Sequence, residues 1–386
     1  MAYIRKRGNK WSYTVSCGID PLTKKPKQIT KSGFATKKEA TSAARKIEAE
    51  VENGTYLKET NTTFEAFAQD WIKIYAQNAK ISSVRARSKE MKHFISVWGP
   101  YQLKKISKQI YQKRIVELSE KYSRNYVSGI HACGRMIFNH AVELGLIKIN
   151  PTENIHLPKH QVKVEEIESQ EEEIKFLEKE ELARFLRTAD SEGLEMDSLI
   201  FTTLAYTGLR IGELLALKWT DFEQEKGSLR VTKTLYNPSN NIKKYELLPP
   251  KTSGSIRTIR IDEKLVKMLK RHAIKQKEIK LQKGILYIDN QFIFARNDGH
   301  PQLRKVVETR LKRLLKKAGI DKNITPHSFR HTHTSLLIEA GVGVKEIQQR
   351  LGHTDINTTM NIYAHMTANM EEKASHQFSK LMKDLL

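Results

Sequence analysis

Four short stretches in the second half of the chain carry cationic and hydroxyl side chains that could act together on one phosphate group. They are TGLRIGEL with Arg210, PPKTSGSIRTIRI with Lys251, ITPHSFRHTHTSLL with His327 and Arg330, and LGHTDINTTMNIYAH with His353 and Tyr363. Fixed guanidinium groups stabilise the charge that builds on the non-bridging oxygens of a phosphodiester under attack. A tyrosine hydroxyl becomes a nucleophile when a base and a good electrophile lie beside it. The set predicts phosphate transfer to Tyr363, with arginines in place of a metal ion.

Each stretch by itself has a simpler interpretation. Arg210 lies in an apolar, helix-like run, where it would be buried and could form a structural ion pair with Glu213, three residues later. Lys251 alone is an ordinary surface lysine in a turn between strands. A metal could bind a pair of histidines spaced i and i+4, but the HExxH glutamate is missing and no carboxylate stands nearby, so no metal site is predicted. The basic side chains of this stretch suit an oxyanion better: His327, Arg330, His331 and His333.

The charge of the whole chain points to a polyanionic partner. Its 386 residues include 67 Lys and Arg against 44 Asp and Glu, giving a net charge of +23 and a pI near 9.7. Nucleic acid and an anionic membrane surface are the two simplest partners. No apolar run reaches the roughly 18–20 residues of a membrane span, and no apolar stretch of a signal peptide follows the basic N-terminus. Cys17 and Cys133 offer neither a disulfide framework nor a metal site, so we expect a reduced cytoplasmic protein with no membrane partner.

Residues 1–58 have the pattern of a small basic sheet followed by a helix. In WSYTVSCGID, apolar and small polar side chains alternate, which predicts a strand with one buried face. PKQITKSGFAT predicts a returning strand, and KKEATSAARKIEAEVENG predicts a helix that ends at Gly54. Residues 1–36 hold eight Lys and Arg and one acid, Asp20. The unit could lie in a DNA groove, or it could be a solvated sheet that happens to be basic. The candidate DNA contacts are Arg5, Lys6, Arg7, Lys10, Lys27 and Lys31.

Three further segments complete a predicted multidomain α+β protein. Residues 62–160 have helical periodicity throughout and predict an all-α unit, in which Arg85 and Arg87 could contact phosphates or simply face solvent. Residues 161–175 hold six glutamates and predict an acidic linker. Residues 176–386 predict a mixed, mainly helical unit with a small antiparallel sheet, which must bring the four stretches together.

At these residues the sequence resembles the tyrosine recombinase family of the phage-integrase type. The family order is Arg, Lys, His-x-x-Arg, His and Tyr, and it is complete at Arg210, Lys251, His327, Arg330, His353 and Tyr363. The resemblance covers about residues 176–370. Residues 62–158, which close with INPTENI, resemble the family's core-binding domain. The N-terminal unit resembles the arm-binding domain of integrases of temperate phages and conjugative transposons.

The resemblance implies a site-specific recombinase with a covalent intermediate. Tyr363 would attack a DNA phosphate, form a 3′-phosphotyrosyl link and release a 5′-hydroxyl, so that neither ATP nor another cofactor is needed. The 5′-hydroxyl of a partner strand would reverse the step and give a Holliday junction. The implied roles are phosphate binding for Arg210 and Arg330, hydrogen bonding to the phosphate for His353, proton acceptance for His327, general acid catalysis for Lys251 and orientation of the arginine for Glu213.

The resemblance also implies partners. They are double-stranded DNA with core and arm attachment sites and three further copies in a homotetramer, with the C-terminal EEKASHQFSKLMKDLL helix passed to a neighbour. The resemblance is also compatible with two further partners, an excisionase and a host DNA-bending protein. The cellular role would be integration and excision of a prophage or an integrative conjugative element.

Four other functions stay open from the sequence. They are a DNA-binding regulator that has lost catalysis, a type IB topoisomerase-like enzyme, a zinc hydrolase built on the His327 cluster, and a basic helical protein whose histidines and tyrosine are merely packed. The complete set of six residues argues against a decayed regulator, and the N-terminal basic sheet favours an integrase because a bivalent protein needs two DNA sites.

Overall fold

A computed structural model describes residues 2–19, 24, 26–53, 61–158, 176–250, 253–352, 360 and 382. The chain divides into two compact units, Met1–Lys163 and Val164–Leu386. Among the described residues, no helix combines the length and the apolar character needed to cross a membrane.

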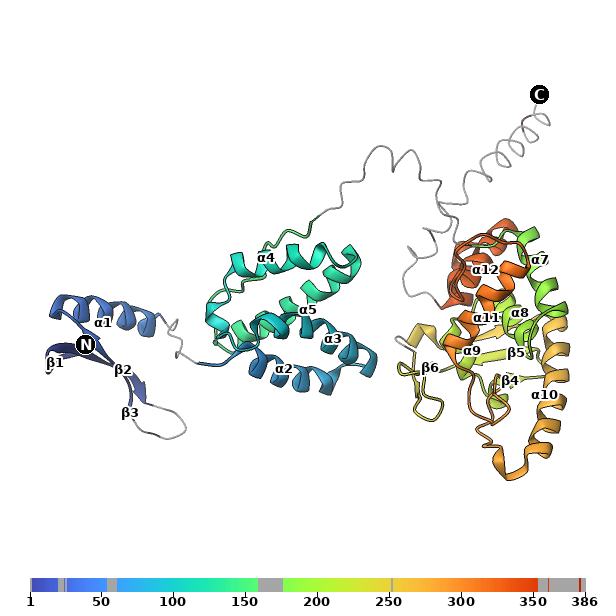
Figure 1. Ribbon diagram of the computed structural model, residues 1–386, viewed down its shortest axis with the longest axis horizontal. Coiled ribbons are helices and arrows are strands. Elements are labelled where there is room, and N and C mark those ends of the chain that lie inside the picture. Colours follow the sequence, from blue (N-terminus) through green and yellow to red (C-terminus); the bar gives the residue numbers. More distant parts are fainter. Residues whose placement is uncertain are drawn as a thin grey trace. The chain divides into compact units, whose positions relative to one another are not determined.

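The first unit begins with a three-stranded antiparallel sheet covered on one face by a helix (Figure 1). The elements are β1 (Tyr3–Arg7), β2 (Lys10–Ile19), β3 (Pro26–Phe34) and α1 (Lys37–Glu52). Gly8, at φ +61°, makes the tight turn between β1 and β2. Tyr13 and Val15 are buried together with Ala44 of α1, so the predicted strand alternation and its buried face are confirmed.

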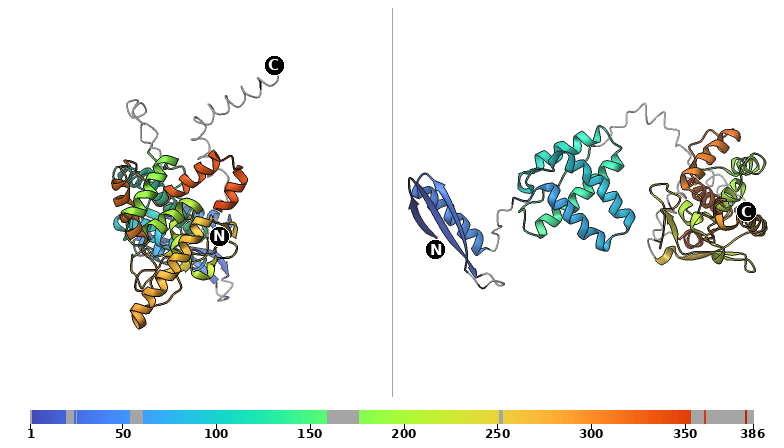
Figure 2. Two further views of the ribbon diagram at one scale, coloured as in Figure 1. Left: turned by 90° about the vertical axis from the view of Figure 1, so that its right-hand side faces the viewer. Right: turned by 60° about the horizontal axis from the view of Figure 1, so that its bottom comes forward.

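Residues 61–158 of the first unit form a helical bundle, seen as the blue-to-green helices in Figure 2. The described helices are α2 (Phe64–Asn78), α3 (Ile81–Trp98), the 3₁₀ helix η1 (Leu103–Lys105), α4 (Lys108–Ser119) and α5 (Arg124–Glu143). Phe64, Phe94 and Tyr111 are each wholly buried in its aromatic core. Thr63 and Ser107 cap α2 and α4 by accepting hydrogen bonds from backbone N–H groups.

The second unit combines helices with two small antiparallel sheets, β4-β5-β8 and β6-β7. Its strands are β4 (Phe222–Glu223), β5 (Ser228–Val231), β6 (Thr234–Tyr236), β7 (Glu246–Leu248) and β8 (Arg257–Arg260). Its α-helices are α7 (Lys179–Ser191), α8 (Asp197–Thr207), α9 (Ile211–Ala216), α10 (Glu263–Lys283), α11 (Arg304–Lys317), α12 (Ser328–Glu339) and α13 (Val344–Leu351). Its 3₁₀ helices are η2 (Trp219–Asp221), η3 (Ser253–Ser255) and η4 (Gly284–Leu286). The predicted mainly helical fold with a small antiparallel sheet is confirmed.

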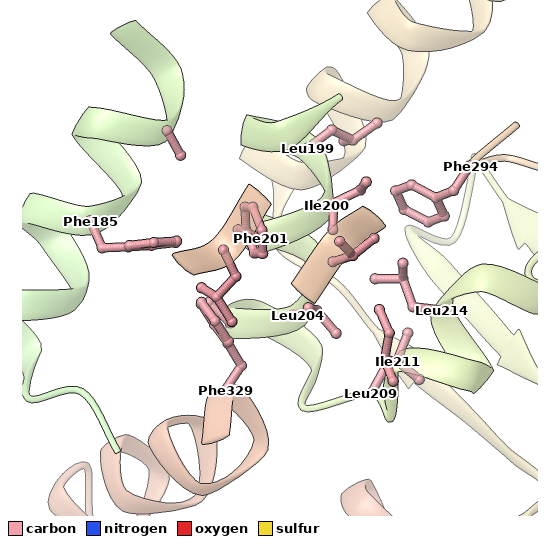
Figure 3. Packing of buried hydrophobic residues seen from close by; sticks show 14 of the residues in the cluster. Phe185, Leu199, Ile200, Phe201, Leu204, Leu209, Ile211, Leu214, Phe294 and Phe329 are labelled. Atoms are coloured by element: carbon pink, nitrogen blue, oxygen red, sulfur yellow. The ribbon is translucent and has the colours of Figure 1, made fainter. Parts of the chain in front are cut away.

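An aromatic cluster fixes α12 within this unit. Phe329, in the first turn of α12, packs against Phe185 of α7 and Phe201 of α8 at ring-centroid distances of 5.4 and 5.6 Å (Figure 3). The Thr332 hydroxyl accepts a hydrogen bond of 3.0 Å from the backbone N–H of Leu177. Because these rings are buried on three helices, the residue after Phe329, Arg330, has a fixed position relative to the end of α8.

Candidate active site

Arg210 lies at the break between α8 and α9 rather than inside a helix. Gly208 ends α8 in the left-handed region at φ +62°, and a Cβ there would lie 2.6 Å from Leu351 and 2.8 Å from His333, so glycine alone fits. Arg210 is then the N-cap residue of α9 with extended backbone. Its side chain is 40% exposed. The expectation of a buried arginine within a helical run is therefore wrong, because the tight contact at Gly208 forces the chain out of the helix.

Glu213 joins Arg210 to a second arginine, Arg257 of β8. Its carboxylate accepts hydrogen bonds from the backbone N–H of Arg210 at 3.0 Å and from Arg210 Nη1 at 2.8 Å. It also accepts a bond of 3.0 Å from Arg257 Nη2. Burial alone would raise the pKa of Glu213, but the hydrogen bonds and charges of Arg257 and Arg210 outweigh it and hold the pKa below its ordinary value. The buried carboxylate of Glu213 is thus ionised, and it holds both the backbone and the guanidinium of the half-exposed Arg210.

Arg330 is almost completely buried beside this pair. Its Nη1 donates to the carbonyl of Gly208 at 2.9 Å, and its Nη2 donates to the carbonyl of Leu351 at 2.8 Å. Burial, and then the charge of Arg210, lowers the pKa of Arg330 to about 9, so the guanidinium remains charged at neutral pH. Arg330 therefore places a positive charge in contact with Gly208, in the turn that leads to Arg210.

His327 is the N-cap residue of α12, one turn before Arg330. Its ring lies edge-on to that of His331, with centroids 4.9 Å apart. Partial desolvation, followed by the charges of His331, Arg330, Arg210 and Arg304, lowers its pKa to about 4. The ring is neutral at pH 7, which is the state that a proton acceptor requires.

Three candidates, Lys251, His353 and Tyr363, lie outside the described residues. So does the C-terminal helix predicted from EEKASHQFSKLMKDLL, apart from Met382. The described chain next to them does converge. The Ser255 hydroxyl donates to the carbonyl of Gly352 at 3.5 Å, so the residues just after Lys251 and just before His353 lie in contact.

The strand register of the N-terminal sheet places the six basic candidates on two opposite faces. Arg5 pairs with Ser12, and Arg7 pairs with Lys10, which places these arginines and Lys10 on the face opposite Tyr13, Val15 and α1. The same face carries the small hydroxyl residues of β2 and β3. The remaining candidates, Lys6, Lys27 and Lys31, lie on the α1 side by strand alternation.

Arg87 has a partner within the helical bundle. Its Nη1 donates to Glu90 at 2.5 Å and to the carbonyl of Gly129 at 3.0 Å, which ties α3 to α5. In the described chain this guanidinium therefore serves packing between helices. Arg85 lies on the same helix, two residues earlier, and is half-buried.

Comparison with known proteins decides the family. Residues 175–370 match the model of the phage integrase family, which is more than half of the chain. The chain belongs to the phage integrase family. Residues 3–51 match the arm DNA-binding domain. The expectation of a site-specific recombinase of this family, acting as a DNA strand transferase, is confirmed at this level.

Several relatives and solved structures match most of the length of this chain. It is 27% identical over 392 residues to the ICEBs1 integrase of Bacillus subtilis (strain 168), with 99% of this chain and 100% of the relative covered. It is 29% identical over 354 residues to an integrase of Staphylococcus phage L54a, with 87% and 98% covered. Among solved structures, the Tn1549 transposon integrase in complex with transposon right end DNA has a TM-score of 0.65 at 22% identity, covering 82% of this chain and 100% of that one. A lambda integrase tetramer bound to a Holliday junction has a TM-score of 0.56 at 18% identity, with 94% of each chain covered.

Sequence reasoning missed Arg257 and Arg350, and it grouped His333 with the anion-binding residues. His333 is buried instead, with Nδ1 bonded to the carbonyl of Ala205 at 2.8 Å and Nε2 to Arg350 Nε at 3.0 Å. The grouping of His333 with an oxyanion site is wrong, because this ring holds α12 to α8 and α13. Arg257 did leave a signal: in SIRTIRI it alternates onto the same face as Ile259, which is buried.

Proposed function

We propose that this chain cuts and rejoins DNA through a 3′-phosphotyrosyl intermediate at Tyr363, and so integrates and excises a mobile element. The observation that carries the proposal is the pairing of a half-exposed Arg210 with a buried Arg330 around the Gly208 turn. The nearby carboxylate of Glu213 bonds to Arg210 and Arg257, whereas Arg330 bonds to the carbonyl of Gly208. The excess positive charge favours a phosphodiester, and it increases the stabilisation of the more highly charged transition state.

The proposed proton transfers are those that the resemblance to tyrosine recombinases implies. The phenolic oxygen of Tyr363 forms a bond to phosphorus, and its proton passes to neutral His327. The bond from phosphorus to the 5′-oxygen breaks, and Lys251 supplies the proton that makes the leaving group a hydroxyl. His353 donates a hydrogen bond to a non-bridging oxygen. Because the covalent link conserves the phosphodiester energy, the reaction needs no ATP, and the cationic side chains provide the charge that a metal ion would otherwise supply.

DNA is bound at two places in this proposal. The open face of the N-terminal sheet, with Arg5, Arg7 and Lys10, contacts arm sites, and its small hydroxyl residues allow close approach to a groove. The helical bundle and the second unit hold the core site, with Arg85 near the phosphates. The domains would be residues 1–58, 62–160 and 176–386. The acidic linker 161–175 would join the second domain to the third. The active assembly would be a tetramer on DNA in the host cytoplasm, and the lambda integrase tetramer on a Holliday junction supports the tetramer and the DNA partner. The proposal leaves room for an excisionase and a host DNA-bending protein as further partners.

A covalent trap tests the proposal. The full chain and Tyr363→Phe would be incubated with nicked DNA carrying candidate attachment junctions, in EDTA and without ATP, then denatured and examined for a protein–DNA adduct. An adduct with the wild type alone is expected. An adduct with both proteins would assign the nucleophile to another residue. Tight binding with no adduct in either protein would favour a DNA-binding regulator, and an adduct that appears only when metal is added back would contradict the metal-independent mechanism.

A further inference from the structure

Arg257 connects two parts of the second unit that are far apart in sequence. Its Nη2 donates to Glu213 of α9 at 3.0 Å, and its Nε donates to the carbonyl of Arg350, in the last turn of α13, at 2.8 Å. Its Nη1 donates to the carbonyl of Ser255 at 3.1 Å. The side chain is buried, so water does not replace these contacts. One guanidinium thus bonds to α9, to the segment before β8 and to α13.

Three side chains hold the end of α13 by donating hydrogen bonds to three successive backbone carbonyls. Arg257 donates to the carbonyl of Arg350, Arg330 to that of Leu351 and Ser255 to that of Gly352. The last carbonyls of a helix have no partner within it, and they carry the negative end of the helix dipole. Two arginines at this terminus therefore satisfy hydrogen bonds and stabilise the dipole together.

The backbone at Gly352 leaves little room for a side chain. Gly352 has φ +68°, and a Cβ there would lie 3.2 Å from Arg257 Cδ and 3.2 Å from Ser255 Cα. The C-terminal end of α13 therefore packs tightly against Arg257 and Ser255. The next residue in sequence is His353, and Tyr363 follows ten residues later.

We propose that Arg257 is a positioning residue that couples the phosphate-binding Arg210 to the exit of α13. It acts on Arg210 through Glu213, and on the C-terminal end of α13, which precedes His353 in the sequence, through the carbonyl of Arg350. The guanidinium fork makes this coupling possible, because it presents donors in fixed directions to two acceptors at once. A lysine has one ammonium group and cannot reproduce both contacts. The inference rests on the proposed phosphotyrosyl chemistry.

Cleavage kinetics on a nicked substrate, with protein in excess, test the coupling. Arg257→Lys is expected to slow the first-order cleavage step by about 10–100-fold, since a misplacement of about 1 Å has effects of this size, while the Kd for the same DNA changes less than about threefold. Arg230→Lys is the matched control, because Arg230 is an exposed arginine on the adjacent strand β5. If Arg257→Lys cleaves as fast as Arg230→Lys, the proposal is wrong.

A double-mutant cycle separates positioning from a general loss of structure. Arg210→Lys, Arg257→Lys and the double variant are compared at saturating protein. If Arg257 acts through Arg210, the double variant slows cleavage by much less than the product of the two single effects. A product of the two single effects would overturn the proposal. Should Arg257→Lys fold poorly by its Tm, Glu213→Gln breaks the same contact from the other side and takes its place in the cycle.

Hydrogen exchange gives a second readout that needs no DNA. In Arg257→Lys the amides of α13 should exchange about tenfold faster than in the wild type, and those in Arg230→Lys should not change. Unchanged exchange in α13 would show that Arg257 does not hold its exit, and would overturn the proposal. If the wild type forms no covalent adduct, the proposed chemistry fails, and the exchange experiment alone then decides whether Arg257 positions α13.

Discussion

His333 makes part of the stability of the second unit dependent on pH, and His333→Gln should remove that part. In the folded chain the ring is neutral, with Nδ1–H donating to Ala205 O and Nε2 accepting from Arg350 Nε. A second proton would remove the acceptor and set a positive ring against a guanidinium. Glutamine offers one amide donor and one carbonyl acceptor, and it binds no proton in this range.

The size of the effect follows from the two pKa values. Burial, and then the charge of Arg350, lowers the pKa of His333 to about 4 in the folded chain, against about 6.5 when unfolded. Because the unfolded chain binds the proton first, the stability is complete above pH 6.5 and is lost as the pH falls towards 4. Linkage gives a loss of about 2 kcal/mol between pH 7 and pH 5 for this one group.

Hydrogen exchange of the full chain measures this loss where it occurs. Peptides from α8 and α12 would be followed at pH 7 and pH 5 and corrected for intrinsic exchange. The opening equilibrium of the wild type should rise about 30-fold more than that of His333→Gln, which corresponds to about 2 kcal/mol. Other groups titrate in both proteins, so only the difference between them reports His333. If the two proteins lose protection equally, the pKa of His333 is not lowered by folding and the reasoning fails.

Four further outcomes are expected. Asp197→Asn removes the buried carboxylate that binds Arg310 and Arg313 at 3.1 Å each, and should cost about 3 kcal/mol in urea unfolding; a loss below about 1 kcal/mol would contradict this. Gly134→Ala places a Cβ 2.3 Å from the Tyr111 hydroxyl, and should lower the stability of residues 61–158 by about 1–3 kcal/mol; an unchanged Tm would argue against this packing. Arg7→Gln should reduce the salt slope of arm-site binding by about 1, and Lys6→Gln, on the α1 side, should not; equal effects would refute the assignment of faces. DNA with an intact scissile phosphate should raise the pKa of His327 above about 4, as followed by histidine NMR of Tyr363→Phe; no change would place the phosphate elsewhere.

The sequence predicted what depends on local order. Alternation in β2 identified Tyr13 and Val15 as the buried face, because strand geometry repeats every two residues. It did not separate Arg5 from Lys6 in function, since the choice of face matters only once β1 is paired with β2. The end of helix α8 at Gly208 also depends on a contact that exists only in the folded chain. A glycine in an apolar run is tolerated in a helix, and it is the contact with Leu351, more than 140 positions away, that excludes any other residue.

The partners of arginines were beyond sequence reasoning for a related cause. Arg87 and Arg257 are both basic residues in amphipathic segments, and their charge says nothing about which acceptor they meet. In the fold, Arg87 bonds to a carbonyl 42 residues away and Arg257 to a carboxylate 44 residues away. Such pairs form because a buried guanidinium must be hydrogen-bonded. The requirement was foreseeable, but its solution was set by how the helices and strands pack.

The charge balance around Glu213 links the binding of an anion to the basicity of His327. Two arginines, Arg210 and Arg257, bond to the one carboxylate. Arg330 adds a third positive charge nearby, and its acceptors at Gly208 and Leu351 are neutral carbonyls. Burial, and then this excess of positive charge, lowers the pKa of His327, which makes the ring a weak base in the DNA-free chain. A bound phosphate would cancel part of that charge and raise the basicity of His327. In the proposed mechanism His327 would then become an effective proton acceptor only when the scissile group is in place. The arginines proposed to bind the phosphate would therefore also control when the tyrosine is activated.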